Sequence, residues 1–223
     1  LAVAKELKAR GYDLGDTDPD AMEPGDLMDM VLNDKEAKFD SPNLNVVHKM
    51  TMEEYERLCP YQNDLHENWG PPPGHLNSDG QNLLVFGAKF GNVFVGVQPS
   101  FGYEGDPMRL LFERDLTPHP QYASFYKWLQ NGFAADAVVH FGMHGTVEWL
   151  PGTPLGNSGL SWSDVLLGEM PNVYVYAANN PSESIVAKRR GYGTIVSHNV
   201  PPYGRAGLYK QLVVLRDLLS EFR

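Results

Sequence analysis

The segment HFGMHGTVEWLPG, residues 140–152, holds the densest group of side chains in this chain that could do chemistry. His140, His144 and Glu148 stand four residues apart, with glycines between them that free the backbone to turn. Two imidazoles and a carboxylate can converge on one divalent ion, or can supply a base beside it. A structural role also fits, with His140 as a hydrogen-bonded core histidine and Glu148 making a structural hydrogen bond. The pattern is not the H-E-x-x-H signature of metalloproteases, because no glutamate directly follows His140.

Two other groups of residues are suited to binding an anion. Asn179 and Asn180 begin the sequence NNPSE, which is typical of a helix start, because Asn caps helices and Pro suits the first helical position. The free N–H groups of such a start also attract anions, so both residues are candidates for substrate binding. Arg189 and Arg190 fall in the last turn of the same expected helix, where the helix dipole favours cations. Their fork geometry equally suits carboxylates, which makes them candidates too.

The elements around these residues predict an α/β fold with a largely parallel sheet and flanking helices. An apolar strand ends near Val139, and ligands in such folds usually bind beyond the carboxyl ends of the strands. Strands alternate with helices from there to the end of the chain, which is typical of parallel sheets. The expected elements are a helix at 121–130, strands at 136–141, 172–178 and 194–199, and helices at 182–190 and 206–221.

The first part of the chain has a different sequence pattern. Residues 1–70 are expected to form a mainly helical segment with acidic turns, in which Thr51 and Glu54 can make a capping box. Residues 71–223 are expected to form the α/β domain that carries residues 140–152. Early in that domain, the runs NLLVFG and NVFVGV predict a β-hairpin joined through AKFGN. In the last helix an apolar seam is expected to pack within this domain; it consists of Leu208, Leu212, Leu215, Leu219 and Phe222.

Composition excludes several classes of protein. The 223 residues include 18 Lys and Arg against 28 Asp and Glu, and the net charge of -10 disfavours binding to nucleic acid. The single cysteine, Cys59, excludes an internal disulfide and a thiolate zinc cluster, and a small buried side chain is expected there. No apolar run approaches the roughly 18 residues of a membrane span. A phosphate loop ending in Lys and Ser or Thr is also absent from the sequence, so nucleotide hydrolysis would need another polypeptide.

Several long motifs, in one order along the chain, resemble the large (H) subunits of magnesium chelatases and, more distantly, the large subunits of cobalt chelatases. These motifs are DKEAKFDSPNLNV, ENWGPPPG, LNSDGQNLLVFG, GNVFVGVQPSFGYEGDPMRLLF, ADAVVHFGMHGTVEWLPG and PNVYVYAANNPSESIVAKRRGYG. The resemblance implies a porphyrin-binding subunit that inserts Mg²⁺, as substrate, into protoporphyrin IX in chlorophyll biosynthesis. It also implies two ATPase-type partner subunits that use ATP, and a porphyrin-delivery protein. Such subunits are several times longer, so this chain is expected to be an internal fragment that is inactive alone. The protein is expected in the plastid stroma if it comes from a plant or alga, and otherwise in the cytoplasm.

The resemblance also suggests roles for the candidate residues. Mg²⁺ prefers oxygen ligands, so Glu148 is the first choice for handling the metal or removing pyrrole protons. His144 is expected to assist as a base, and His140 to orient or ligate the metal. The porphyrin propionates are expected to meet Arg189 and Arg190.

Two positions depart from the magnesium branch of the family. Trp149 stands where that branch has Phe, and Thr153 where it has Lys, so EWLPG is closer to the cobalt branch, whereas GYEGDPMRLLF and AANNPSE favour magnesium. The alternatives are a cobalt chelatase subunit, a non-catalytic porphyrin-binding paralogue, or a metallohydrolase that activates water at His140, His144 and Glu148.

Overall fold

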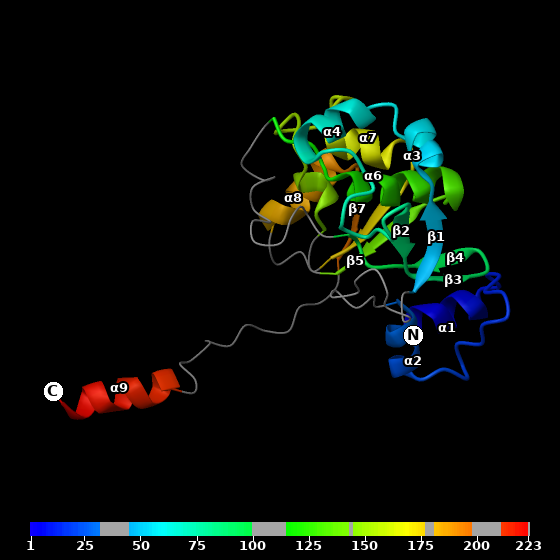
Figure 1. Ribbon diagram of the computed structural model, residues 1–223. Coiled ribbons are helices and arrows are strands. Elements are labelled where there is room, and N and C mark those ends of the chain that lie inside the picture. Colours follow the sequence, from blue (N-terminus) through cyan, green and yellow to red (C-terminus); the bar gives the residue numbers. More distant parts are fainter. Residues whose placement is uncertain (32–44, 100–114, 143–144, 177–180, 198–210, 223) are drawn as a thin grey trace.

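A computed structural model of the chain describes residues 1–31, 45–99, 115–142, 145–176, 181–197 and 211–222 (Figure 1). The helices are α1 (Ala2–Ala9), α2 (Pro24–Val31), α3 (Met52–Leu58), α4 (Gln62–Trp69), α6 (Pro120–Lys127), α7 (Trp162–Leu167), α8 (Pro181–Arg190) and α9 (Gln211–Glu221). The strands are β1 (Val46–Met50), β2 (Leu83–Phe86), β3 (Ala88–Phe90), β4 (Val93–Val95), β5 (Val138–Phe141), β6 (Asn172–Val175) and β7 (Thr194–Val196). Two short turns complete the elements, a π turn at Trp128–Gly132 and a 3-10 turn, η2, at Val147–Trp149.

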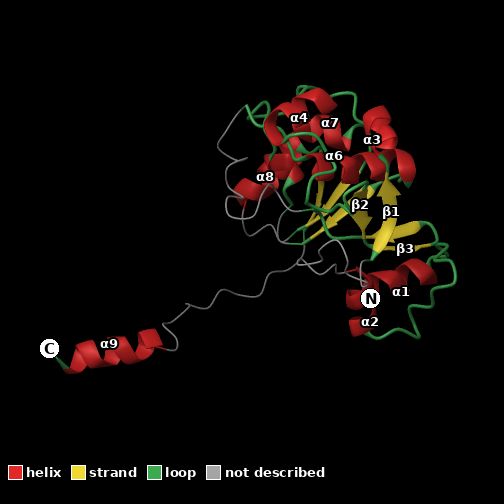
Figure 2. Ribbon diagram, in the orientation of Figure 1, coloured by secondary structure: helices red, strands yellow, loops and turns green. Residues whose placement is uncertain are grey.

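The site of interest depends on a parallel sheet of three strands in the order β5-β6-β7. Two antiparallel pairs, β1 with β2 and β3 with β4, lie beside it. Figure 2 shows the helices α3, α4, α6 and α7 gathered over one side of these strands. The predicted α/β fold, with a parallel sheet, flanking helices and helices at the N-terminus, is therefore confirmed.

The two faces of the parallel sheet have different surroundings. On one face, His140, Tyr174 and Ile195 are neighbours across the three strands. Tyr174 is buried there, and it packs with Ile195 and with Ala187 of α8. The opposite face presents apolar side chains that are partly or largely exposed, since successive residues of a strand point to opposite faces. These side chains are Val139, Phe141, Val173, Val175 and Val196.

Helix α6 is at the centre of the largest core cluster, and all its residues from Pro120 to Tyr126 are buried. Pro120 occupies the first position of the helix. Proline suits this position because the N–H that it lacks would have no partner within the helix. His119 caps it by accepting a hydrogen bond from the Gln121 N–H. The same cluster takes in Cys59, as expected from the sequence, and burial raises the pKa of its thiol to about 12.

Local sequence signals are confirmed in the described residues. The Thr51 hydroxyl accepts a hydrogen bond from the Glu54 N–H at 3.1 Å, which is the predicted helix cap of α3. Helix α1 ends just before Gly11, whose φ of 82° is the left-handed conformation that favours glycine. Helix α8 begins at Pro181, as the NNPSE sequence predicts.

Two expectations about strands were wrong. Residues 46–50, in the segment expected to be helical, form β1 and pair with β2. The hairpin was expected between residues 82–87 and 92–97, but it joins β3 to β4 instead. The reason is that β2 is buried along its whole length and finds its partner in a distant strand, which short-range turn signals do not reveal.

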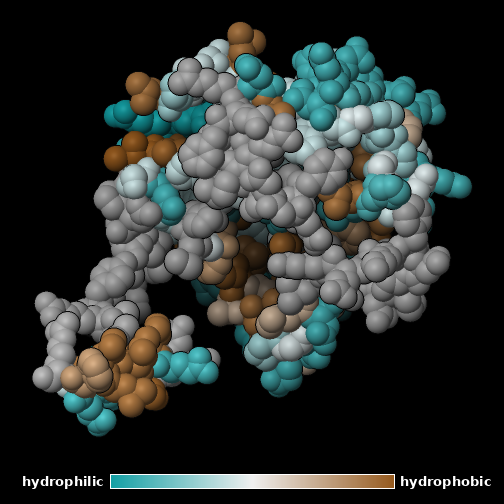
Figure 3. Space-filling view, turned by 60° about the vertical axis from the view of Figure 1, so that its left-hand side comes forward, coloured by the Kyte–Doolittle hydropathy of each residue, from teal (hydrophilic) through white to brown (hydrophobic). Residues whose placement is uncertain are grey.

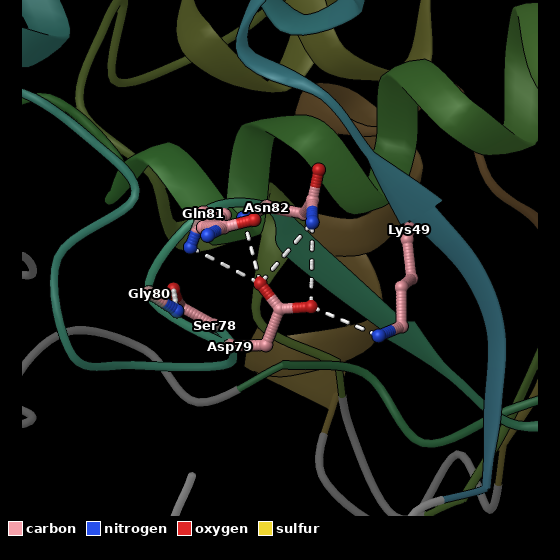
Figure 4. A network of polar contacts seen from close by, with 6 residues as sticks. All are labelled: Lys49, Ser78, Asp79, Gly80, Gln81 and Asn82. Carbon is pink, nitrogen blue, oxygen red and sulfur yellow. Dashed lines mark hydrogen bonds and ion pairs between the residues drawn. The ribbon is translucent and has the colours of Figure 1, made fainter.

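The turn before β2 is held by one carboxylate (Figure 4). Asp79 Oδ1 accepts hydrogen bonds from the N–H groups of Gln81 and Asn82, at 3.1 and 2.8 Å. Lys49 Nζ, from β1, lies 2.9 Å from Asp79 Oδ2. These contacts hold the pKa of Asp79 well below its usual range, the bond from Lys49 being the largest cause. The LNSDGQ motif thus ties β1 to the turn that leads into β2.

Helix α9 lies apart from the rest of the described chain (Figures 1 and 3). It has no buried residue, and Figure 3 shows its apolar surface in brown, facing solvent. Leu212, Leu215, Leu219 and Phe222 are between 52% and 91% exposed, and Leu208 lies outside the described residues. The prediction that this seam packs within the domain is therefore wrong for residues 211–222, because helical periodicity identifies an apolar face but not what covers it. None of the helices in the described ranges is long and apolar enough to cross a membrane.

Candidate functional site

Glu148, the first candidate, sits in the 3-10 turn η2, in the loop that follows β5. Its side chain is buried, with 1% of the residue exposed. The hydroxyl of Tyr174, from the central strand β6, lies 2.8 Å from each of its two carboxylate oxygens and donates to them. The carboxylate is thus enclosed by the protein and held by a neutral donor.

The main chain around Glu148 is fixed by Arg190, at the end of α8. The two terminal nitrogens of this guanidinium donate to the carbonyl oxygens of Glu148 and Leu150, at 2.8 and 2.7 Å. Arg190 is 8% exposed, and burial lowers the pKa of its guanidinium, against the opposing charges of Asp164 and Glu148. One buried side chain thus supplies donors to two main-chain carbonyl groups of this loop.

His140 is held at both ring nitrogens. Asn172 donates from Nδ2 to the carbonyl of Gly191 at 2.7 Å, which turns its Oδ1 toward the histidine. His140 Nδ1 lies 2.8 Å from that oxygen and must therefore carry the proton. Its Nε2 is then an acceptor for the Tyr126 hydroxyl at 3.1 Å. Burial lowers the pKa of His140, with the bond to Asn172 acting in the opposite direction, and a neutral imidazole fits this pattern of bonds.

The hydrogen bonds continue from Tyr126 back to the loop that carries Glu148. Gln98 donates from Nε2 to the hydroxyls of Tyr126 and Tyr122, at 2.5 and 2.8 Å. Its Oε1 accepts from the backbone N–H and the hydroxyl of Thr146, at 3.2 and 2.9 Å. Thr146 donates to Gln98, Gln98 to Tyr126, Tyr126 to His140 and His140 to Asn172, so the protons of this chain all point the same way. Burial raises the pKa of both tyrosines, so their hydroxyls remain donors.

Tyr174 joins the two halves of this arrangement. Its ring stacks on His140, with centroids 4.7 Å apart and planes at 22°, while its hydroxyl bonds to Glu148. Burial raises the pKa of Tyr174, and the nearby Glu148 charge raises it further. Tyr174 therefore contacts His140 through the face of its ring and Glu148 through its hydroxyl.

The other candidates are placed differently. Arg189 is exposed, whereas the neighbouring Arg190 points inward, to η2. His144, Asn179 and Asn180 lie outside the described residues. Among the residues that the structure does describe, no three His, Cys, Asp or Glu side chains form a group that could hold a metal ion. Metal binding by His140, His144 and Glu148, and substrate contact by the two arginines and two asparagines, stay predictions.

Sequence reasoning missed the residues that support the candidates. Tyr174, Asn172 and Tyr126 were assigned only to strands or to a helix, although they hold His140 and Glu148. One signal was available for the first two. Tyr174 and Asn172 alternate along a strand next to β5, so they share a face on which His140 is also expected.

Comparisons with known proteins agree on one family. Residues 1–223 match the family described as CobN/Magnesium Chelatase. The chain is 52% identical over 222 residues to the chloroplastic magnesium-chelatase subunit ChlH of Oryza sativa subsp. indica, covering 100% of this chain and 16% of the relative. It is 45% identical over 221 residues to the H subunit of the magnesium chelatase of Cereibacter sphaeroides, covering 99% and 18%.

Cobalt chelatases are also similar. The aerobic cobaltochelatase subunit CobN of Pseudomonas aeruginosa is 42% identical over 154 residues, which cover 69% of this chain and 12% of that protein. The solved structure of the catalytic subunit of cobaltochelatase from Mycobacterium tuberculosis matches with a TM-score of 0.70 and 32% identity, over 99% of this chain and 19% of that one. The chain thus spans less than a fifth of the length of each of these relatives.

Proposed function

Because the chain belongs to the CobN/magnesium chelatase family, we propose that it is part of the large subunit of a magnesium chelatase, which inserts Mg²⁺ into protoporphyrin IX. The choice of magnesium is supported by 52% and 45% identity to two magnesium-chelatase subunits over essentially the whole chain. The complete subunit works with two ATPase-type partner subunits that consume ATP, and it receives its porphyrin from a delivery protein. Its pathway is chlorophyll biosynthesis, in the plastid stroma of a plant or alga or in the cytoplasm of a bacterium.

The observation that carries the chemistry is the buried carboxylate of Glu148 in the loop beyond β5. Metal insertion requires two pyrrole protons to leave and Mg²⁺ to give up water. A carboxylate can accept a proton and is also the kind of ligand that Mg²⁺ prefers. We assign Glu148 to these tasks, with His144 as an assisting base. Burial strengthens its electrostatic effect on a nearby cation, because less water screens the charge.

His140 has a different part in this proposal. As a neutral imidazole bonded to Asn172 and Tyr126, it orients the site from the strand side. Direct ligation by His140 would need Nε2 to give up its bond from Tyr126. The propionates of the porphyrin are assigned to Arg189, which is exposed, and to Asn179 and Asn180, which directly precede α8 in the sequence. Arg190 contributes by holding η2 in place.

Cobalt insertion is the second candidate, favoured by two observations. The family resemblance places the EWLPG sequence nearer the cobalt branch, and the catalytic subunit of a cobaltochelatase has a similar structure over 99% of this chain. Thr153, where the magnesium branch has Lys, is exposed and so accessible to a partner or substrate. Both reactions would use the same carboxylate. They differ in the ion accepted, because Co²⁺ binds nitrogen ligands more readily than Mg²⁺ does.

The test is the substitution Glu148→Gln in the full-length subunit, assayed with its two partner subunits, ATP, protoporphyrin IX and either Mg²⁺ or Co²⁺. The amide keeps the volume of the side chain but carries no charge and accepts no proton at neutral pH. Turnover should fall by about 10²- to 10⁴-fold, the usual contribution of a general base. The dissociation constant for porphyrin, measured by fluorescence quenching, should change by less than about tenfold, since ring binding rests mainly on apolar contacts.

A matched control is Glu169→Gln, which makes the same chemical change at an exposed position in the turn before β6 and should leave turnover unchanged. Near-normal turnover in Glu148→Gln would remove this residue from the reaction. Insertion of Co²⁺ in preference to Mg²⁺ by the unmodified protein would favour the second candidate, and insertion of neither would identify a non-catalytic porphyrin-binding paralogue. The 223-residue chain alone should insert no metal.

A further inference from the structure

Tyr174 contacts His140 and Glu148, the two candidate metal-site residues that the structure describes, and nothing in the proposed reaction yet uses it. It lies on the inward face of the central strand β6 and is 2% exposed. Its hydroxyl is 2.8 Å from both carboxylate oxygens of Glu148. A donor placed equally between the two oxygens sets the rotation of the carboxylate plane, which the flexible Glu side chain would not fix by itself.

The surroundings of this hydroxyl leave it little freedom. A Cβ atom at position 145 would lie 1.8 Å from the Tyr174 hydroxyl oxygen and 3.2 Å from Oε2 of Glu148. The close approach of the tyrosine to the loop is therefore compatible only with glycine at this position. On its other side, the Tyr174 ring is stacked on His140. The strand, the stack and Gly145 together fix where the hydroxyl lies.

The backbone and the side chain of Glu148 are thus held by different residues. Arg190 binds the main-chain carbonyl of Glu148 at 2.8 Å, and Tyr174 binds the carboxylate. A group that handles a metal ion or a proton must be oriented to within a fraction of an ångström, and hydrogen bonds from supporting residues supply that orientation. Removal of such a supporting bond at metal sites typically costs about 10- to 100-fold in affinity or activity.

We propose that Tyr174 is a positioning residue that orients the Glu148 carboxylate for metal insertion. This inference rests on the proposed function, since it assigns Tyr174 a role only through Glu148. The role belongs to the hydroxyl, whereas the ring serves the packing against His140.

The test is Tyr174→Phe in the full-length subunit, assayed with its partner subunits and ATP. Phenylalanine keeps the ring and its stack on His140 and removes only the hydroxyl. Turnover should fall by about 10- to 100-fold, and the Mg²⁺ concentration for half-maximal rate should rise. The dissociation constant for protoporphyrin IX should stay within about threefold of its value in the unmodified subunit, because binding of the porphyrin does not depend on the orientation of one carboxylate. A melting temperature close to that of the unmodified subunit shows that the variant is folded.

The matched control is Tyr176→Phe, two residues along the same chain. The hydroxyl of Tyr176 donates to Glu183 at 2.6 Å and belongs to a different pair. Its loss should change turnover by less than about threefold. An equal loss in both variants would mean that either hydroxyl merely supports the fold, and would overturn the proposal.

A double variant separates the positioning role from the function on which it rests. If Tyr174 acts only through Glu148, then Glu148→Gln with Tyr174→Phe should be no slower than Glu148→Gln alone. If the double variant is slower than Glu148→Gln by the same factor that Tyr174→Phe costs alone, the positioning role is wrong, although Glu148 stays in the mechanism. The same conclusion follows if Tyr174→Phe has normal turnover while Glu148→Gln is inactive. Normal turnover in Glu148→Gln would defeat the function itself, and any loss in Tyr174→Phe would then have to come from another cause, which overturns this proposal too.

Discussion

At the scale of single residues, Gly145 decides whether the tyrosine and the carboxylate can meet. We expect Gly145→Ala to push the Tyr174 hydroxyl out of place, since a methyl group cannot occupy a point 1.8 Å from its oxygen. The bond to Glu148 would break, and the buried carboxylate would lose a donor, which typically costs about 1–3 kcal/mol in the free energy of unfolding.

Urea unfolding of the 223-residue chain measures this cost. The control is Gly142→Ala, in the same loop, where an added Cβ meets no atom of the described residues within 4 Å and should change stability by less than about 0.5 kcal/mol. Equal stability of the two variants would show that the contact between loop and tyrosine can relax at no cost.

At the scale of elements, the start of α6 gives the protein a dependence on pH. His119 caps this central helix and is 6% exposed, and burial lowers its pKa from 6.5 to about 4. In the folded state it therefore stays neutral at pH values where the unfolded chain binds a proton. As pH falls from about 6.5 to about 4, proton binding favours the unfolded state, and stability should drop by up to about 3 kcal/mol. Below that range the histidine contributes no further change.

We expect His119→Asn to remove this part of the pH dependence. Asparagine is among the best helix caps, so α6 keeps its acceptor but loses the titrating group. The difference in free energy of unfolding between variant and unmodified chain, measured from pH 7 to pH 4.5, cancels the titration of all other groups. His75→Asn, at an exposed position, is the control. A constant difference across this range would show that His119 titrates equally in both states.

What the sequence could predict about these elements depends on the range of the interactions involved. The cap of α3 and the proline start of α8 are set within four residues, and both were predicted correctly. The loop after β5 was recognised because polar residues directly follow an apolar strand. The pairing of β1 with β2 was missed, because it joins residues more than thirty positions apart.

The candidate site shows the same limit at the level of side chains. Glu148 and His140 were chosen by type and spacing, but the tyrosine between them comes from another strand. The inward turn of Arg190 was also not foreseen. The sequence of two adjacent arginines at a helix end does not indicate which of them faces a neighbouring loop. Here Arg190 faces the loop because it donates hydrogen bonds to the carbonyls of Glu148 and Leu150.

At the scale of the whole molecule, the described residues leave two apolar surfaces in solvent. One is the outer face of the parallel sheet, where Phe141 is 74% exposed, and the other is the seam of α9. Parallel sheets usually have both faces covered. We therefore expect most of the stability of the 223-residue chain to come from the cluster around α6, which is the largest of the three buried apolar clusters in the described residues.

Two leucine substitutions compare these regions. Leu166→Ala, at a fully buried position in the α6 cluster, should lower the free energy of unfolding by about 2–5 kcal/mol. Leu219→Ala, at a position that is 57% exposed in α9, should change it by less than about 0.5 kcal/mol. Both values come from denaturant unfolding of the same chain. A large loss in Leu219→Ala would mean that α9 packs against the body of the protein in solution.

The burial of Cys59 has a practical consequence for labelling. Thiols react as thiolates, and this one is fully enclosed, with its pKa raised to about 12, so it should be inert to maleimide near neutral pH. It is also the only cysteine of the chain. A cysteine introduced at exposed Gly142, beside the loop of Glu148, would therefore be the one thiol to accept a fluorophore, and its emission would report the arrival of a porphyrin at that loop.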